Sequence, residues 1–168
     1  YRVGDKWQEA EVLTEIIPVR LAKDVEHKVL ITRHGPVLFR INDAGISLSW
    51  TGTETDRPVF DALYKLNHAS GWQDFSAALS TYSDPPQLFV FADRWGNSGC
   101  QAAGIVPIRT KATQGTMLTL GSEPKSKWDG FIPFDKLPQS FVPAGTESGA
   151  MPVIAANQRP STGTALPK

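Results

Sequence analysis

The sequence has few of the residues that build disulfide-linked or metal-centred domains. It contains one cysteine, Cys100, and three histidines in 168 residues. A single cysteine excludes an internal disulfide and does not distinguish an oxidising from a reducing compartment. The histidines, His27, His34 and His68, lack the spacing of metal ligands, so we expect no histidine metal site.

Net charge and long apolar runs are also absent. Seventeen basic side chains balance seventeen acidic ones, which leaves no net field to attract nucleic acid or an anionic membrane. No apolar stretch approaches the roughly 20 residues that span a bilayer, and the N-terminus lacks the layout of a secretory signal. We therefore expect no nucleic-acid or membrane partner, and a piece that does not begin where a natural chain would.

Strand patterns dominate the first 50 residues. Residues 12–20 are rich in β-branched side chains, but Pro18 favours an edge or irregular strand. Three further strand-like segments, separated by turn residues, follow at 28–32, 37–41 and 46–50. Together they predict an antiparallel meander with one buried face.

Two short helices are expected next. Asp56 can cap a helix over residues 57–67 that has Pro58 in its first turn. Its apolar residues recur at helical spacing, and they are Val59, Phe60, Leu63 and Leu66. Ser70 can cap a second helix, which the prolines after Asp84 cannot continue. One face of this second helix is predicted to carry Trp72, Phe75 and Leu79.

The last third begins with a hairpin. Strand-like residues 87–92 and 99–105 flank a turn at 93–97, which Asp93 and Asn97 can fix through side-chain bonds to neighbouring amides. The remainder is dense in proline and glycine and carries aromatic residues without a clear period. We expect it to pack as an irregular arm across an apolar surface. The length and the 40% apolar content fit one domain over residues 1–168.

Three clusters of motifs then follow one another along the chain. T-R-H-G-P-V stands at 32–37, A-D-R-W-G-N-S-G at 92–99 with G-I-V-P-I-R at 104–109, and W-D-G-F-I-P-F-D-K-L-P at 128–138 with A-N-Q-R-P at 156–160. In this order and spacing they resemble the penicillin acylase (penicillin amidase) family of N-terminal nucleophile hydrolases. The resemblance covers nearly the whole chain and places it inside the β-subunit, after the family's nucleophile.

The resemblance implies an α+β fold that is part of the four-layer αββα sandwich, with antiparallel strands, two short helices and a Pro/Gly-rich arm. It implies an amidohydrolase that cleaves linear acyl amides, such as a penicillin side chain or an acyl-homoserine lactone, by acyl transfer to an N-terminal serine. An α-amine with a pKa near 8 can accept the serine proton around neutral pH. Tyr1 cannot replace that serine, so we expect a partial domain that is inactive alone.

The resemblance also implies roles for individual residues. Asn157 matches the side-chain oxyanion donor, and a neutral amide N–H suits that role because it stabilises the developing O⁻ without competing as a nucleophile. Leu63 and Phe89 match positions that line the acyl pocket, although core packing explains both equally well. Without the resemblance, Asn157 would be interpreted as a turn residue.

The resemblance also indicates which cofactors and partners to expect. No cofactor is expected, although the Pro107 carbonyl corresponds to a backbone ligand of the calcium that some members carry, with the other ligands outside these residues. The implied partners are the α-subunit, the remaining β-subunit segments and a small amide substrate. The family implies a periplasmic or secreted location.

The same residues allow other interpretations. A Ser-His-Asp triad on His34 and Asp93 is disfavoured because no G-x-S-x-G motif occurs, and His34 is expected to be structural, with Gly35 allowing another backbone to come close. For Arg33 and Arg109 two alternatives stay open: each pairs with a carboxylate elsewhere in the parent protein, or each is solvated. The sequence departs from the family at Leu88, at Val142-Pro143 and at Gln158, which leaves the substrate open, and a non-enzymatic binding module of the same fold is the alternative function.

Overall fold

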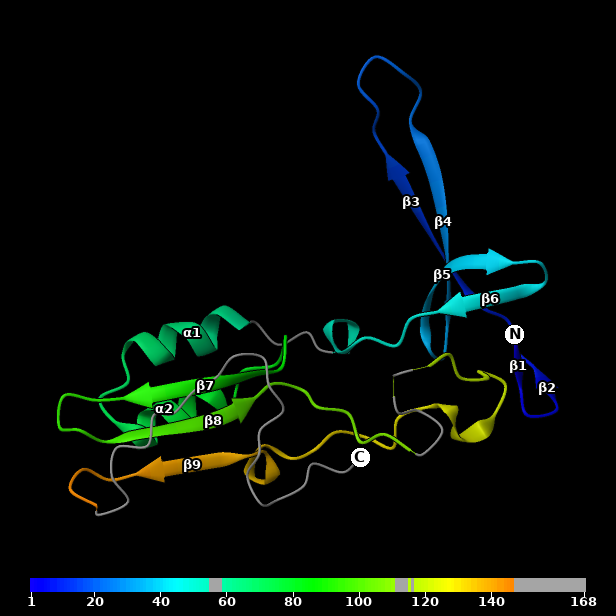
Figure 1. The fold of residues 1–168 in the computed structure, drawn as a ribbon. Helices are drawn as coiled ribbons and strands as arrows, with labels where there is room; N and C mark the ends of the chain where they lie inside the picture. Colours follow the sequence, from blue (N-terminus) through cyan, green and yellow to red (C-terminus); the bar gives the residue numbers. More distant parts are fainter. Residues whose placement is uncertain (55–58, 111–114, 116, 147–168) are drawn as a thin grey trace. The chain divides into compact units, whose positions relative to one another are not determined.

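The computed structural model describes residues 1–54, 59–110, 115 and 117–146 (Figure 1). The chain divides into two compact units. Unit 1 comprises Tyr1–Thr53 and Arg109–Asp129, and unit 2 comprises Glu54–Ile108 and the described residues from Gly130 onward. None of the helices in the described part is long and apolar enough to cross a membrane.

Unit 1 is built from antiparallel strands (Figure 1). A small hairpin of β1 and β2 precedes a four-stranded sheet with the order β3-β4-β5-β6, which confirms the expected antiparallel meander. The expected buried face is wrong for this chain, because every residue of β3 to β6 is exposed or only partly buried. The described part of the unit also contains the short 3₁₀ turns η1 and η3. The bounds are β1 Arg2–Val3, β2 Lys6–Trp7, β3 Glu11–Ile17, β4 Val25–Thr32, β5 Gly35–Ile41, β6 Ala44–Ser47, η1 Thr51–Thr53 and η3 Pro124–Ser126.

Strand β3 is the edge strand that its proline predicts. It ends at Ile17, directly before Pro18, and pairs only with β4. Strand β4 in turn pairs with β5 only at its last two residues, Ile31 and Thr32. The greater part of β3 and β4 is therefore a two-stranded ribbon, and apolar side chains such as Val12 and Ile16 are exposed on it.

The turn between β4 and β5 depends on a glycine. The turn residues are Arg33 and His34, and Gly35 follows with a φ of 100°. A Cβ on Gly35 would lie 2.2 Å from the carbonyl oxygen of Leu48, whose N–H donates to the Pro36 carbonyl at 3.0 Å. The expected close approach of another backbone at Gly35 is confirmed, because only a residue without a side chain fits here.

Arg33 and His34 hold a distant part of unit 1 against this turn. Arg33 Nη2 donates to the carbonyl oxygens of Gly121 at 3.1 Å and Glu123 at 2.6 Å, and to Ser126 Oγ at 3.0 Å. His34 Nε2 lies 2.9 Å from the Gly121 carbonyl oxygen and 3.0 Å from Arg33 Nε. These contacts join segments about 90 residues apart in sequence, as the separations of 87 to 93 residues show. We call them the Arg33–His34 clasp.

The clasp favours the neutral form of its imidazole. Desolvation lowers the pKa of His34 below the ordinary value of 6.5, and the charges of Arg33 and Lys127 lower it further, while the hydrogen bond with the Gly121 carbonyl opposes them. A proton on both ring nitrogens would place a second positive charge 3.0 Å from the guanidinium Nε. His34 is therefore structural, as expected, and neutral when the clasp is intact.

Unit 2 packs two helices on a three-stranded antiparallel sheet (Figure 1). The strand order is β7-β8-β9, so β8 is central. Buried residues of both helices and of the sheet form one hydrophobic cluster: Ala62, Phe75, Leu79, Tyr82, Phe91 and Ala103. The bounds are α1 Val59–Asn67, α2 Trp72–Leu79, β7 Gln87–Ala92, β8 Ser98–Ala103, η4 Phe134–Lys136 and β9 Gln139–Val142.

Helix α2 lies directly on the sheet. Leu79 is fully buried and Phe75 nearly so, and Trp72 meets the ring of Phe91 edge-on at 5.6 Å and stacks on Phe141 at 5.1 Å. A Cβ on Gly99 in β8 would lie 2.9 Å from the Trp72 ring. The predicted face of this helix is confirmed, and Gly99 provides the space for it.

The predicted face of α1 is partly wrong. Val59 and Leu66 pack on the core as expected, but the residue buried between them is Ala62. Phe60 is 84% exposed and Leu63 is 38% exposed. With 3.6 residues per turn, Phe60 points away from the core and Leu63 lies at the border between the core-facing and the exposed sides of the helix. The small Ala62 side chain allows the closer approach to the core. The predicted cap, Asp56, and Pro58 lie outside the described residues.

The hairpin turn between β7 and β8 forms as the sequence predicts. The Asp93 carboxylate accepts hydrogen bonds from the amides of Trp95 at 2.9 Å and Asn97 at 3.0 Å, and from Asn97 Nδ2 at 2.7 Å. Gly96 supplies the positive φ, at 88°. Desolvation raises the pKa of Asp93, but the bonds from Asn97, Trp95 and Gly96 together lower it below its ordinary value, so the ionised carboxylate holds the turn.

The Pro/Gly-rich arm contains more structure than its sequence predicts. Residues 139–142 form β9, which extends the hairpin to a three-stranded sheet by pairing with β8. The pairing places Gly99 opposite Phe141, which is far from it in sequence. Strand β9 lies directly between Pro138 and Pro143. A four-residue strand between prolines has too short a pattern to be recognised from sequence.

Replacing Gly35 by alanine should destabilise unit 1. The new Cβ would overlap the Leu48 carbonyl oxygen at 2.2 Å, and the φ of 100° is unfavourable for an L side chain. We expect a loss of about 2 kcal/mol or more in the free energy of unfolding. Denaturant unfolding measures it, and Gly71→Ala is the control, since a Cβ there meets nothing within 4 Å. Equal stability of both variants would contradict this close approach.

The Arg33–His34 clasp should make stability depend on pH. The unfolded chain protonates His34 near pH 6.5, while the folded chain protonates it at lower pH. The contribution of the clasp is therefore complete above about pH 6.5 and decreases as the pH falls below it. Thermal unfolding between about pH 5 and pH 7.5 should show this decrease, and His34→Gln should reduce it. His27→Gln, on the ribbon, should leave it unchanged, and an unaltered pH profile in His34→Gln would disprove the assignment.

Candidate functional site

The two residues predicted to line an acyl pocket have different surroundings. Leu63 lies on the exposed side of α1, next to Phe60 and Tyr64. Phe89 is partly buried against the core cluster, and its ring meets Tyr82 edge-on at 5.0 Å. The contacts of Phe89 are those of a core residue, whereas Leu63 is available to a ligand or to another segment. Both pocket roles remain predictions.

The exposed side of α1 forms an apolar stripe. Phe60, Leu63 and Tyr64 follow one another at helical spacing and are 84%, 38% and 66% exposed. Nearby, Lys65 forms an exposed ion pair with Asp61 at 2.6 Å. Three large apolar side chains together on a solvent-facing helix are typical of a surface that binds an apolar partner or ligand.

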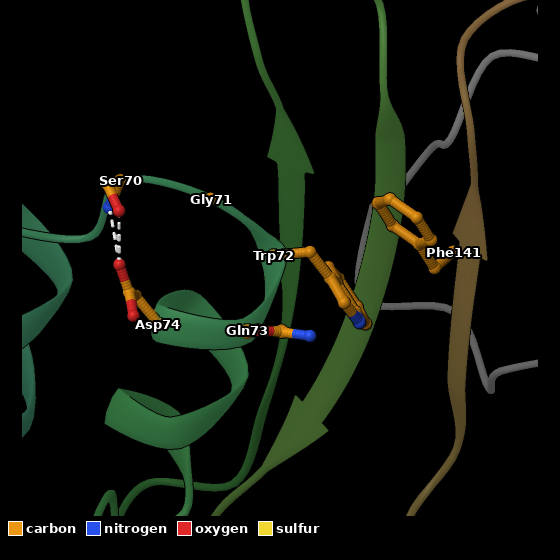
Figure 2. Close-up of a pocket in the computed structure, with 6 residues that line it drawn as sticks. All are labelled: Ser70, Gly71, Trp72, Gln73, Asp74 and Phe141. Atoms are coloured by element: carbon orange, nitrogen blue, oxygen red, sulfur yellow. Dashed lines mark hydrogen bonds between the residues drawn. The ribbon is translucent and has the colours of Figure 1, made fainter.

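A shallow pocket of about 370 Å³ opens at the start of α2 (Figure 2). Its aromatic side is the stack of Trp72 on Phe141, with ring centroids 5.1 Å apart and an interplanar angle of 28°. Figure 2 shows Asp74 and Ser70 on the opposite side. The pocket is lined by Ser70, Gly71, Trp72, Gln73, Asp74 and Phe141.

The polar pair in this pocket corrects the expected helix cap. The residue at the cap position is Gly71, which has no side chain to cap the helix. The Ser70 hydroxyl donates to the Asp74 carboxylate, and the same carboxylate accepts the Ser70 N–H at 3.1 Å (Figure 2). Asp74 thus reaches back to Ser70, and the hydroxyl of Ser70 caps no amide. Asp74, within the first turn of the helix, is the residue that fixes this end.

The Ser70–Asp74 pair is not a catalytic arrangement. The hydrogen bonds from the Ser70 hydroxyl and amide lower the pKa of Asp74 below its ordinary value. Lowering the pKa of a carboxylate makes it a weaker base, so Asp74 does not activate the serine hydroxyl. The pocket can contact a small apolar group on its aromatic side, but its described residues supply no activated nucleophile.

Among the described residues, Ser126 lies near the clasp imidazole, and its hydroxyl is not activated either. Ser126 Oγ lies 3.4 Å from His34 Nε2, but it donates to the Glu123 carbonyl at 2.6 Å and accepts from Arg33. The hydroxyl is buried and committed to these partners. Sequence reasoning missed Ser126, because only the fold brings residues 34 and 126 together. The expectation that His34 is not part of a serine triad agrees with this geometry.

Two further predicted groups can be placed only in part. Asn157 lies outside the described residues. Pro107 forms an isolated antiparallel bridge with Phe131, next to the bond from Ile108 N–H to the Gly130 carbonyl at 2.8 Å. In the described part of the chain, no three His, Cys, Asp or Glu side chains come close enough to hold a metal ion. The role of the Pro107 carbonyl as a calcium ligand stays a prediction.

Comparison with known proteins gives the broader context. The sequence model described as "Penicillin amidase" matches residues 1–167. An acyl-homoserine lactone acylase QuiP from Pseudomonas fluorescens strain Pf0-1 is 30% identical over 149 residues, and a QuiP from Pseudomonas putida strain KT2440 is 29% identical over 152 residues. The matched regions are 82% and 86% of this chain but 18% of each acylase.

The fold agrees with these relatives. The thermostable penicillin G acylase from Alcaligenes faecalis, solved in an orthorhombic crystal form, superposes with a TM-score of 0.69 and 25% sequence identity over 86% of this chain and 26% of that chain. Antiparallel sheets with two short helices match this neighbour, which confirms the expected α+β fold of an N-terminal nucleophile hydrolase. Since the family pattern extends over nearly all of its residues, the chain belongs to the penicillin amidase family.

Proposed function

We propose that these residues are part of an amidohydrolase that cleaves a linear acyl amide through an acyl-enzyme on an N-terminal serine. The family match over residues 1–167 carries this proposal. The relatives are acyl-homoserine lactone acylases, and the structural neighbour is a penicillin G acylase. The substrate class is therefore an acyl amide of that kind, such as an acyl-homoserine lactone or a penicillin side chain.

In this proposal the chain contributes to the electrophilic side of the reaction. The serine hydroxyl attacks the amide carbonyl, the serine's own α-amine takes the hydroxyl proton and passes it to the leaving amine, and water later releases the acid. The Asn157 side-chain amide donates a hydrogen bond to the oxyanion of each tetrahedral intermediate. The serine belongs to another segment of the polypeptide, so the isolated 168 residues are expected to be inactive. No cofactor is required for these steps.

The apolar stripe of α1 supports a role in binding the acyl group. Leu63, the predicted pocket residue on this helix, is accessible, and the neighbouring Phe60 and Tyr64 extend the apolar surface. An acyl chain lying against these side chains would be removed from water, at about 25 cal/mol for each Å² of apolar surface. Phe89 would support this surface from the core rather than contact the acyl chain directly.

The proposed partners are the α-subunit and the remaining β-subunit segments of the parent acylase. The exposed ribbon of β3 and β4 supports this, since an isolated two-stranded ribbon is marginally stable in water, and its side chains Val12, Leu13, Ile16 and Ile17 are exposed. The parent is proposed to act in the periplasm or outside the cell.

Asn157→Ala in a polypeptide of the relatives' length that carries these residues tests the catalytic role. Removing one oxyanion donor should lower kcat by about 100- to 1000-fold and change KM little, because the donor acts mainly on the intermediate. Hydrolysis of phenylacetyl amides and acyl-homoserine lactones would be measured. Gln158→Ala is the matched control, one residue away, and should retain most of the activity.

Three outcomes of that experiment separate the alternatives. Activity lost in Asn157→Ala and retained in Gln158→Ala supports the proposal. Hydrolysis by the isolated 168 residues would mean that the nucleophile has been misassigned. A correctly folded long polypeptide that cleaves no acyl amide would instead favour a binding module of the same fold.

Leu63→Ala tests the acyl-binding surface separately. If the acyl group lies on the stripe, the loss of apolar contact should raise KM for long, apolar acyl groups by about tenfold. Short acyl groups that do not reach Leu63 should be affected less. Lys65→Ala on the same helix is the control and should leave KM unchanged for long and for short acyl groups. An equal effect of Leu63→Ala on long and short acyl groups would argue against contact with the acyl chain.

A further inference from the structure

The hairpin turn between β7 and β8 also contacts a distant part of the chain. Asn97 Oδ1 accepts a hydrogen bond from the Ala144 N–H at 2.8 Å, although the two residues are 47 positions apart. Ala144 lies just beyond the end of β9 at Val142. A Cβ on Gly96 would lie 3.4 Å from the Ala144 Cβ, so the chain also packs against the turn. The turn therefore holds the chain at the point where it leaves the sheet.

The backbone ladder of the sheet does not make this contact. The pairing of β9 with β8 ends at Val142, and Pro143 follows without an N–H that could continue it. The backbone N–H and carbonyl of Asn97 are both engaged with Asp93, at 3.0 Å each. The Asn97 side chain is thus the group that supplies an acceptor for the Ala144 N–H.

Asp93 sets the direction of the Asn97 amide. A carboxylate only accepts hydrogen bonds, so it faces the Nδ2 end of the amide, which donates to Asp93 Oδ2 at 2.7 Å. The Oδ1 end then accepts from Ala144. The N–H groups of Trp95 and Asn97 hold the carboxylate in turn, at 2.9 and 3.0 Å. We call this arrangement of Asp93, Asn97 and Ala144 the exit tether.

The residues after the tether form a closed turn. Gly145 has a φ of 75°, which favours glycine, and Thr146 Oγ1 donates to the Pro143 carbonyl at 3.0 Å. The described residues end at Thr146, and the sequence continues from there to Asn157, the proposed oxyanion donor. The exit tether and this turn therefore fix where the segment that carries Asn157 begins.

We propose that Asn97 is a positioning residue of the acylase, which acts on catalysis through Asn157. This inference rests on the proposed function, because Asn157 has its oxyanion role only there. An oxyanion donor is effective when it is held in place before the charge develops, and a displacement of about 1 Å can cost about 100-fold in rate. Loosening the chain at Ala144 would leave the donor less often in its competent position.

A double-mutant cycle tests the coupling in a polypeptide of the relatives' length that carries these residues. Asn97→Ala should lower kcat about tenfold and change KM little. In an Asn157→Ala background the same substitution should have almost no further effect, because the group that it positions is absent. Arg94→Ala, an exposed change in the same turn, is the control and should leave kcat unchanged. An equal loss in both backgrounds would show an effect on stability alone and would overturn the proposal.

Exchanging the two side chains of the turn provides a rescue. Asn97→Asp alone keeps an acceptor for Ala144 but places a second carboxylate against Asp93, across a contact of 2.7 Å, so kcat should fall. Adding Asp93→Asn restores a donor to this contact, with the direction of the hydrogen bond reversed. The exchanged pair should recover kcat to within about threefold of the unmodified polypeptide. A pair no more active than Asn97→Asp alone would contradict the proposal.

Hydrogen exchange measures the exit tether without reference to activity. In the isolated chain, Asn97→Ala should accelerate exchange of the Ala144 N–H by about tenfold or more, and Arg94→Ala should not. Unchanged exchange in Asn97→Ala would refute the tether. A long polypeptide that cleaves no acyl amide would reject the proposed function and the positioning role together. An active one in which the two substitutions act independently would reject the positioning role alone, so the two failures are distinguishable.

Discussion

The packing of α2 on its sheet depends on the absence of a side chain at Gly99. The Trp72 ring occupies the space where a Cβ would lie, 2.9 Å from the nearest ring atom, and the carbonyl oxygen of Ser140 closes the other side of that space at 2.5 Å. Trp72 therefore contacts strands β7 and β9 at once, through Phe91 and Phe141. This contact identifies the face of the sheet on which α2 packs.

Once the helix side is fixed, the alternation of side chains fixes the rest of the sheet. Phe89 points to the core because it is two residues from Phe91, and Val90 points to the face of the sheet that lies away from α2. The same packing places Ala62 rather than Leu63 against the core, since the small side chain allows α1 a close approach. Unit 2 consequently presents the apolar stripe of α1, which its own described residues leave exposed.

Unit 1 is organised by backbone contacts instead of a large core. Gly35 lets the Leu48 carbonyl close on the turn, and the Arg33–His34 clasp satisfies carbonyl oxygens of a segment that lacks a regular ladder. A guanidinium is well suited to this because its planar N–H groups can serve several acceptors at once. The T-R-H-G-P motif therefore has a structural explanation, in which each of its three central residues makes a specific contact with distant backbone.

The sequence by itself determined the local elements and the family. β-branched runs, turn residues and helical spacing identified the meander, both helices and the hairpin, because each of these patterns is set by neighbours within a few residues. Tertiary structure alone decided the inward face of α1, the strand β9 and the meeting of Arg33 and His34 with Ser126. These depend on contacts between residues far apart in the chain, such as Gly99 with Phe141, which leave no periodic trace in sequence. For the site, resemblance could assign Asn157, Leu63 and Phe89 their roles, but only packing could separate the accessible Leu63 from the core-facing Phe89.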